Sequence, residues 1–369
     1  MSGERKRPRT QDLETLWDIA TLLQTTLNLE QVLDMALTQA MKAVNAEAGT
    51  LWLQDNQTDE YIYPVLARGP KADGLKGLKL KTGEGMAGWV VANGQLQLIS
   101  DVSEDPRWAQ RFDQSTGFIT RSLLCVPLLT QTSCIGCIQL VNKQDGKLFD
   151  DDDVNLCQAL AGVIGVAVEN SRLYTDLKTM FKSFLVTLAS AIDARDPYTR
   201  GHSDRVSKYS MGIGKALGLS DKKQETLERA ALLHDIGKIG IRDNILLKES
   251  PLDKEEFQIM QTHTIVGKKI LHDILPAYLV QEISQGAACH HERYDGKGYP
   301  QGMKGNEIPL IARIIAIADT FDAMTTDRPY RKGLATEAAL QELERCSGSQ
   351  FDPKLVDKFL TEMRNGAYQ

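Results

Sequence analysis

The sequence predicts a multidomain α+β/α protein, in which an N-terminal α/β domain is joined by a long helix to an all-α helical bundle. Three observations support this fold class. The 369 residues are enough for two domains, and strand-like apolar segments alternate with turn residues through the first half. No proline occurs between residues 154 and 193, which favours one long helix. The segments after residue 193 have helical periodicity, and all six histidines lie between residues 202 and 291.

Composition limits the classes of function. Hydrophobic content of 42% and charged content of 25% are ordinary for a globular protein, and the net charge of −6 argues against broad nucleic-acid binding. The basic stretch in residues 1–10 is expected to be a flexible tail. No signal peptide or membrane-length apolar run is visible, so we expect a cytoplasmic protein without a membrane or nucleic-acid partner.

The six cysteines show no disulfide framework. Cys134 and Cys137 form a CxxC pair, but they lie in a predicted strand, where residues three apart point to opposite faces. A second cysteine pair with the spacing of a zinc site is missing. We therefore expect core thiols there.

The first half has the pattern of a sheet flanked by helices. Apolar spacing predicts helices over residues 11–28 and 29–44, and a glycine-framed short helix over 83–94. The predicted strands are bounded by Gly, Asp, Asn or Pro and cover residues 49–55, 60–67, 75–80, 95–100, 121–129 and 133–142. A sheet of this kind is expected to carry a ligand-sized cavity on one face.

Several motifs of this half match a family of small-molecule sensors. They occupy residues 83–90, 105–107, 118–127, 135–136 and 140–143. Residues 11–172 resemble GAF domains, and they are similar to those of cyclic-nucleotide phosphodiesterases. Most of the signature of those domains is present, at Asn142, Lys143, Phe149 and Asp153, while Val154 replaces its closing Glu. A nucleotide sensor and a domain that only packs and dimerises both stay open, and the ligand is unknown.

The connector, residues 173–192, carries apolar residues at near-heptad spacing. These are Leu173, Leu177, Met180, Phe184 and Leu188. The spacing predicts a two-stranded coiled coil and therefore a homodimer. The alternative is a helix that packs on its own domain.

The stretch LHDIGKIGI, residues 233–241, places a histidine, an aspartate and a lysine in an apolar run. A buried salt bridge would explain His234 and Asp235 if they stood alone. On a helix, Lys238 would lie on the same face as His234. Burial of these charges is costly unless a metal or a phosphate offsets it.

Further candidate ligands follow at helix positions. A capping box at Asp253 and Glu256 starts a helix that is expected to carry His263 and His272. The other predicted ligand helices begin near residue 202 or cover 224–235, 277–292 and 310–319. Together they present His202, His234, Asp235, His263, His290, His291 and Asp319. Seven ligands on facing helices are too many for one ion with open positions, so they suit two ions of iron, manganese or zinc. One aspartate would bridge the two ions, as in the two-metal sites that cleave phosphoesters.

The order of these motifs matches a known family. The set His202, His234-Asp235 and Asp319 resembles the HD superfamily of metal-dependent phosphohydrolases. His263, His290-His291-Glu292 and the loop Asp295–Pro300 resemble its HD-GYP branch, which hydrolyses the bacterial second messenger cyclic di-GMP. The resemblance implies an HD-GYP domain over residues 193–369.

The resemblance also implies roles for individual residues. One metal ion, iron or manganese, would bind His202, His234, Asp235 and Asp319. A second would bind Asp235, His263, His290 and His291. Catalysis would use Asp235 and Lys238, with Lys238 on the scissile phosphate. Tyr299, Arg328 and Arg331 would hold the dinucleotide, which would be opened to pGpG and further to GMP.

Other interpretations remain beside this one. Tyr198 stands where three-metal members carry Glu, which predicts two ions. Asp322 is an alternative ligand to Asp319. Glu292 is a candidate group for orienting a histidine, and His272 is expected to be a surface or packing residue. The substrate alternatives are another cyclic dinucleotide or a nucleotide, and a non-catalytic receptor is a third reading. The resemblance implies that the Asp295–Pro300 loop docks GGDEF-domain proteins.

Overall fold

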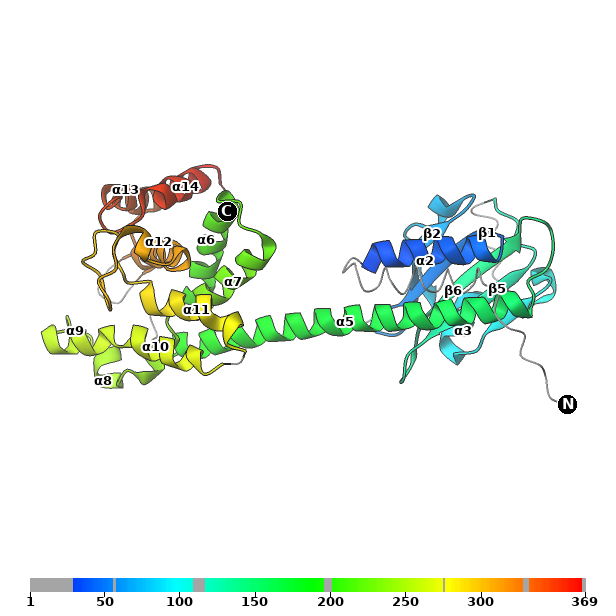
Figure 1. Ribbon diagram of the computed structural model, residues 1–369, viewed down its shortest axis with the longest axis horizontal. Helices are drawn as coiled ribbons and strands as arrows, with labels where there is room; N and C mark the ends of the chain where they lie inside the picture. The colour runs from blue at the N-terminus through cyan, green and yellow to red at the C-terminus, as the bar shows by residue number, and fades with distance from the viewer. Residues whose placement is uncertain are drawn as a thin grey trace. The chain divides into compact units, whose positions relative to one another are not determined.

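The computed structural model describes residues 29–55, 58–108, 117–195, 201–274, 276–327 and 332–366. Compact packing divides the chain into two units, with the boundary between Leu177 and Lys178 (Figure 1). The predicted tail and the predicted helix over 11–28 lie outside the described residues.

The first unit is built on an antiparallel sheet. Its strands, within the described residues, run in the order β3-β2-β1-β6-β5-β4. They are β1 (Ala46–Gln54), β2 (Tyr61–Arg68), β3 (Leu80–Lys81), β4 (Gln97–Ile99), β5 (Leu123–Leu129) and β6 (Cys134–Lys143). Helix α2 (Leu29–Ala43) and the first part of α5 (Asp151–Asp193) share one apolar core with the sheet. Helix α3 (Gly85–Asn93) shares the core of the other face.

One predicted strand is largely absent. Residues 75–80 were expected to be extended, but the 3₁₀ helix η1 (Ala72–Leu75) precedes them and β3 begins only at Leu80. Gly77 has a φ of +77°, a left-handed conformation that interrupts a strand. The remaining predicted strands are confirmed. A second short 3₁₀ helix, η2 (Val102–Glu104), follows β4.

The expectation that Cys134 and Cys137 lie on opposite faces is wrong. Both pack in the core beneath α3, where their Sγ atoms approach the carbonyl oxygens of Val90 and Ala87. The pairing of β5 with β6 shifts between Leu128 and Leu129, so the register skips one residue of β6. Such a bulge changes the side-chain alternation, which brings both thiols to one face.

Helix α5 is continuous from Asp151 to Asp193, as predicted. Its early turns bury Leu156, Leu160 and Ile164 in the core of the first unit. Its last turns bury Leu185 and Ile192 in the core of the second. The connector is therefore the end of a helix that contributes to both cores.

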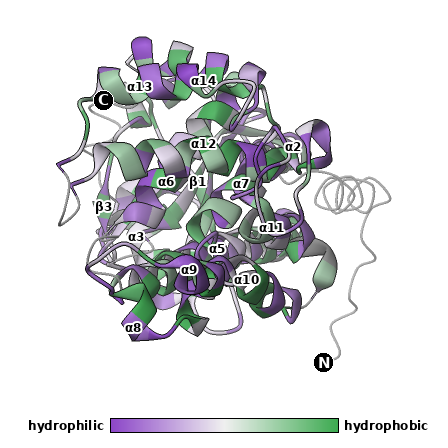
Figure 2. Cartoon of the chain, turned by 90° about the vertical axis from the view of Figure 1, so that its left-hand side faces the viewer, coloured by the Kyte–Doolittle hydropathy of each residue, from purple (hydrophilic) through white to green (hydrophobic). Residues whose placement is uncertain are grey.

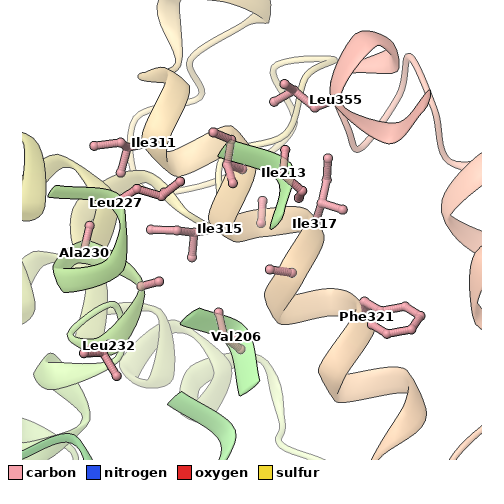
Figure 3. Packing of buried hydrophobic residues seen from close by; sticks show 14 of the residues in the cluster. Val206, Ile213, Leu227, Ala230, Leu232, Ile311, Ile315, Ile317, Phe321 and Leu355 are labelled. Atoms are coloured by element: carbon pink, nitrogen blue, oxygen red, sulfur yellow. The ribbon is translucent and has the colours of Figure 1, made fainter. Parts of the chain in front are cut away.

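The second unit is an all-α bundle, as predicted. Its described elements are α6 (His202–Ala216), α7 (Asp221–Leu232), η3 (Ile236–Gly240), α8 (Asp243–Leu246), α9 (Lys254–Gln261), α10 (His263–His272), α11 (Ala277–Cys289), η4 (Gly305–Glu307), α12 (Leu310–Thr325), α13 (Thr336–Arg345) and α14 (Pro353–Arg364). Side chains from α6, α7 and α12 meet in its core (Figure 3). Hydrophilic and hydrophobic residues alternate along the turns of α13 and α14 (Figure 2).

Several predicted helix ends differ from the structure. Helix α7 ends at Leu232, so His234 and Asp235 occupy the turn before η3, and Lys238 lies in η3 instead of on a shared α-helical face. The capping box at Asp253 is confirmed, but its helix stops at Gln261 and a second helix begins at His263. Within the described chain, no helix combines the length and the apolar character needed to cross a membrane.

Candidate metal centre

Three predicted ligand histidines share one backbone arrangement. The Nδ1 atoms of His234, His263 and His290 lie 2.7, 2.7 and 3.0 Å from the carbonyl oxygen three residues earlier, at or next to a helix end. Carbonyls near the end of a helix lack an intrahelical partner and are free to accept. Because a carbonyl only accepts, Nδ1 carries the proton in each ring and Nε2 keeps its lone pair.

The Nε2 atom of His234 is buried, and among the described residues it has no hydrogen-bond partner. An unsatisfied buried nitrogen is costly, and a metal ion would satisfy this one. The arrangement therefore fits a metal ligand better than the buried salt bridge that the sequence alone allowed.

The carboxylate of Asp235 divides its two oxygens between the surrounding histidines. Its Oδ1 lies 3.5 Å from Nε2 of His263 and 3.8 Å from Nε2 of His290. Its Oδ2 lies 3.5 Å from Nε2 of His234 and 3.9 Å from Nε2 of His202. Each oxygen thus faces a different pair of histidine nitrogens.

The seven predicted ligands gather into overlapping groups. One group holds His202, His234 and Asp319, and another holds His263, His290 and His291. A third joins His234, Asp235 and His290, and within each group the ligating atoms lie within 4.8 Å of one another. The structure therefore brings together every predicted metal ligand.

A close backbone approach brings two of these segments together. A Cβ on Gly237 would lie 1.8 Å from the carbonyl oxygen of His263 and 2.5 Å from the nitrogen of Gly267. Only glycine lets η3 lie this close to α10. Asp235, two residues before Gly237, therefore reaches His263.

Asp319 and Asp322 contact opposite sides of the His202 ring. Asp319 Oδ1 lies 3.4 Å from Nε2, which faces the cluster, whereas Asp322 Oδ2 lies 2.7 Å from Nδ1. Arg205 donates to Asp322 from Nε at 2.6 Å and from Nη2 at 3.0 Å. This geometry makes Asp319 the ligand candidate and Asp322 the group that orients His202. Arg205 carried no sequence signal, because its role depends on a partner in a distant helix.

Burial and hydrogen bonding shift the pKa values of the clustered histidines in opposite directions. Burial lowers the pKa of His263 and His290, and that of His291 to about 4. Burial also acts against the charge on His202, but hydrogen bonds to Asp319 and Asp322 outweigh it and raise the pKa to about 10. Burial would raise the pKa of Asp235, but the charge of Lys238, with Nζ 2.6 Å from Oδ2, helps hold it well below its ordinary value.

The loop after the paired histidines forms one wall of the centre. The ring of Tyr299 stacks on His291, with centroids 4.8 Å apart and planes 30° apart. Glu292 accepts from the backbone nitrogens of Gln301 at 2.7 Å and Met303 at 3.0 Å. Glu292 therefore orients this loop, and not a histidine ring as expected.

The other predicted residues divide into two sets. His272 is exposed beside Asp273, in agreement with its surface assignment. Tyr198, Arg328 and Arg331 lie outside the described residues.

The first unit has a pocket of its own on the α3 side of the sheet. Its volume, with the open mouth included, is about 740 Å³, and its lining includes Trp52, Trp108, Phe118, Arg68 and Gln139. The signature residues Asn142 and Lys143 lie outside this lining.

Asn142 instead holds a neighbouring segment. Its Oδ1 accepts from the backbone nitrogens of Arg121 and Ser122, and its Nδ2 donates to the carbonyl oxygen of Ile119 and to Glu47. Lys143 pairs with Asp153 at 2.6 Å. In this structure Asn142 holds the segment that carries the pocket residues Phe118 and Thr120, whereas Lys143 joins β6 to α5, and neither side chain lines the pocket.

Comparison with protein families agrees with both units. The GAF domain model matches residues 28–168 and the HD domain model matches residues 187–355. This chain carries a GAF domain followed by an HD domain. The GAF sheet and the HD helical bundle correspond to the two units of the fold.

Curated relatives include several phosphodiesterases. A cyclic di-GMP phosphodiesterase of Thermotoga maritima is 41% identical over 51% of this chain and 50% of its own length. A 3′3′-cGAMP-specific phosphodiesterase 2 of Vibrio cholerae is 39% identical over 53% of this chain and 38% of its own. The cyclic di-GMP phosphodiesterase response regulator RpfG of Xanthomonas campestris is 42% identical over 48% of this chain and 46% of its own length. The chain thus spans half or less of the length of these relatives.

Proposed function

We propose that this chain is a metal-dependent phosphodiesterase that hydrolyses a cyclic dinucleotide, with cyclic di-GMP as its substrate. The observation that carries the proposal is the position of Asp235, whose two oxygens face different pairs of buried histidine nitrogens. A shared carboxylate between two donor groups suits a pair of ions. The names of the curated relatives support the class of substrate.

The donor set is suited to two divalent ions, iron or manganese. One would be held by His202, His234, Asp235 and Asp319, and the other by Asp235, His263, His290 and His291. Divalent ions, when bound, lower the pKa of water to give a nucleophile and offset the charge of the phosphate.

The other residues would bind and orient the substrate. Lys238 lies beside Asp235 and would place its positive charge on the scissile phosphate. Tyr299, stacked on His291, would support a guanine base at the edge of the centre. Arg328 and Arg331 are proposed to bind guanine or phosphate. Hydrolysis of one ester bond would give pGpG, and hydrolysis of the second would give GMP.

Replacement of two central residues tests this assignment. We expect the double substitution His234→Ala, Asp235→Ala to abolish cyclic di-GMP hydrolysis while the helical circular dichroism spectrum stays that of the wild type. The matched control is His272→Ala, which changes an exposed histidine outside the cluster. Wild-type turnover in the double variant would contradict the proposed site.

A second candidate substrate is 3′3′-cGAMP, because one of the relatives is named for it. Hydrolysis rates for cyclic di-GMP, 3′3′-cGAMP and a linear dinucleotide, measured on the same manganese-loaded sample, separate the two. A kcat/KM for 3′3′-cGAMP above that for cyclic di-GMP would assign the chain to the second substrate.

We also propose that the GAF domain regulates hydrolysis through a ligand in its pocket. Support comes from the aromatic and polar lining, with Trp52 donating to Gln139 at 2.9 Å. Removal of residues 1–172 should change the turnover of the remaining chain. Equal turnover with and without these residues would contradict regulation.

The homodimer is proposed to form along α5. Leu173, Leu177, Met180 and Phe184 keep heptad spacing and are each more than half exposed. Substitution of Leu177 and Met180 by Glu should convert a dimer into a monomer in analytical ultracentrifugation.

Docking of GGDEF-domain proteins on the Asp295–Pro300 loop is a further proposal. A substitution at Lys297, which is exposed in this loop, would test it in a binding assay.

A further inference from the structure

The last residue of α5 contacts the segment that carries the first metal ligand. Asp193 is buried, and its carboxylate accepts from Oγ of Ser203 at 2.9 Å and from the nitrogen of Ser203 at 3.3 Å. Ser203 directly follows His202 at the start of α6. The position of His202 is therefore tied to the end of α5.

Arg195, two residues later, contacts the segment that carries Lys238. Its Nη1 donates to the carbonyl oxygens of Lys238 at 3.3 Å and Ile239 at 2.8 Å. Its Nη2 donates to the carbonyl oxygen of Ile241 at 3.1 Å and to the carboxylate of Asp243 at 2.7 Å. A guanidinium at the end of a helix satisfies free carbonyls and offsets their partial negative charge. Arg195 thus fixes the end of η3.

One ion pair between α5 and the HD domain lies away from the metal centre. Lys182 pairs with Glu228 on α7, and its side chain is 60% exposed. That ion pair touches no residue of the metal groups. Asp193 and Arg195 differ because each contacts a segment that holds a candidate ligand or the phosphate-binding lysine.

We propose that Asp193 and Arg195 are positioning residues for the metal centre. Together they set the separation between His202 and the segment 234–238, which carries His234 and Asp235 in a turn and Lys238 in η3. Metal affinity and turnover then depend on where the last turn of α5 lies. The inference rests on the proposed metal-dependent function, and it adds two residues that belong to none of the sequence motifs.

Mn²⁺ binding to the metal-free full chain tests the proposal without substrate. Asp193→Asn and Arg195→Met should each weaken Mn²⁺ binding in calorimetry by about tenfold, the lower end of the range for groups that hydrogen-bond a metal ligand directly, because each acts through a neighbouring residue. Ser203→Ala, which deletes only the hydroxyl partner, should weaken it in the same direction. The double variant Asp193→Asn, Ser203→Ala should bind no more weakly than Asp193→Asn alone, because both act through one contact.

The matched control is Lys182→Met, which removes a contact of the same helix away from the centre. It should keep wild-type Mn²⁺ affinity, whatever it does to thermal stability. Wild-type affinity in Asp193→Asn, Arg195→Met and Ser203→Ala would overturn the proposal, as would an equal loss in Lys182→Met. A wild-type chain that binds Mn²⁺ but hydrolyses no cyclic dinucleotide would instead refute the proposed function.

Discussion

Replacement of Asp322 by Asn should weaken metal binding without removing a proposed metal ligand, because Asp322 orients His202. The Asp322 carboxylate is buried and accepts from Nδ1 of His202 at 2.7 Å and from Arg205 at 2.6 and 3.0 Å. In the variant, the oxygen remains with Arg205 and the amide NH₂ faces the ring. Metal binding requires a neutral His202 ring, which beside Asp322 keeps its proton on Nδ1. An amide donor requires Nδ1 to accept, so the single proton of the neutral ring would lie on Nε2, the atom that faces Asp319.

The magnitude follows from this change of tautomer. The loss of a group that fixes a ligating histidine costs about 10- to 100-fold in metal affinity. That range corresponds to about 1.4 to 2.8 kcal/mol. The number of ions bound at saturation should equal that of the wild type, because no proposed ligand is removed.

The assay is calorimetric titration of metal-free protein with Mn²⁺, followed by turnover of cyclic di-GMP at saturating metal. The matched control is Asp352→Asn, since Asp352 is also buried and also pairs with an arginine, Arg313, at 2.6 Å. The control should keep wild-type Mn²⁺ affinity. Unchanged affinity in Asp322→Asn would refute the orienting role, and a fall to one ion per chain would make Asp322 a direct ligand.

Three further predictions concern the same domain. Gly237→Ala should abolish Mn²⁺ binding or lower the thermal midpoint strongly, since its Cβ would lie 1.8 Å from the His263 carbonyl oxygen. Gly240→Ala should do much less, because the nearest atom that its Cβ would meet is a methyl of Val266 at 3.0 Å. Glu292→Gln should raise KM more than it lowers kcat, because the Glu292 carboxylate accepts from the backbone nitrogens of Gln301 and Met303 and so holds the loop that carries Tyr299. Steady-state kinetics with cyclic di-GMP would check this. Mn²⁺ affinity should rise by about tenfold per pH unit from pH 7 towards 10, because His202, with a pKa of about 10 without metal, must lose its proton to bind. Calorimetry at pH 7 in buffers of different ionisation enthalpy should detect the release of one proton per bound ion. A Mn²⁺ affinity that does not change with pH would contradict this prediction.

Periodicity and motifs predicted most of the elements but not their ends. The sheet and the continuous α5 follow from local apolar spacing, which each segment carries in its own residues. The broken helices at Leu232 and Gln261 were missed, because the sequence around them remains compatible with helix. At both positions a histidine ring donates a hydrogen bond to a carbonyl oxygen near the helix end. These helix ends are stabilised only when the histidines are assembled in the cluster.

The Cys134 and Cys137 assignment failed for a related reason. Strand alternation is a local rule, whereas the bulge depends on how β5 and β6 pair. The role of Glu292 was also missed, because its backbone partners lie in a loop whose path the sequence does not reveal.

The sequence by itself determined the two-domain order, the helical bundle and the identity of the seven candidate ligands, because residue type and spacing carry that information. The tertiary structure decided how those ligands are used. It placed Asp235 between two donor groups, assigned Asp319 and Asp322 to opposite sides of one ring, and brought Asp193 and Arg195 against the centre. These are contacts between segments far apart in the chain, and their distances depend on packing that no local pattern encodes.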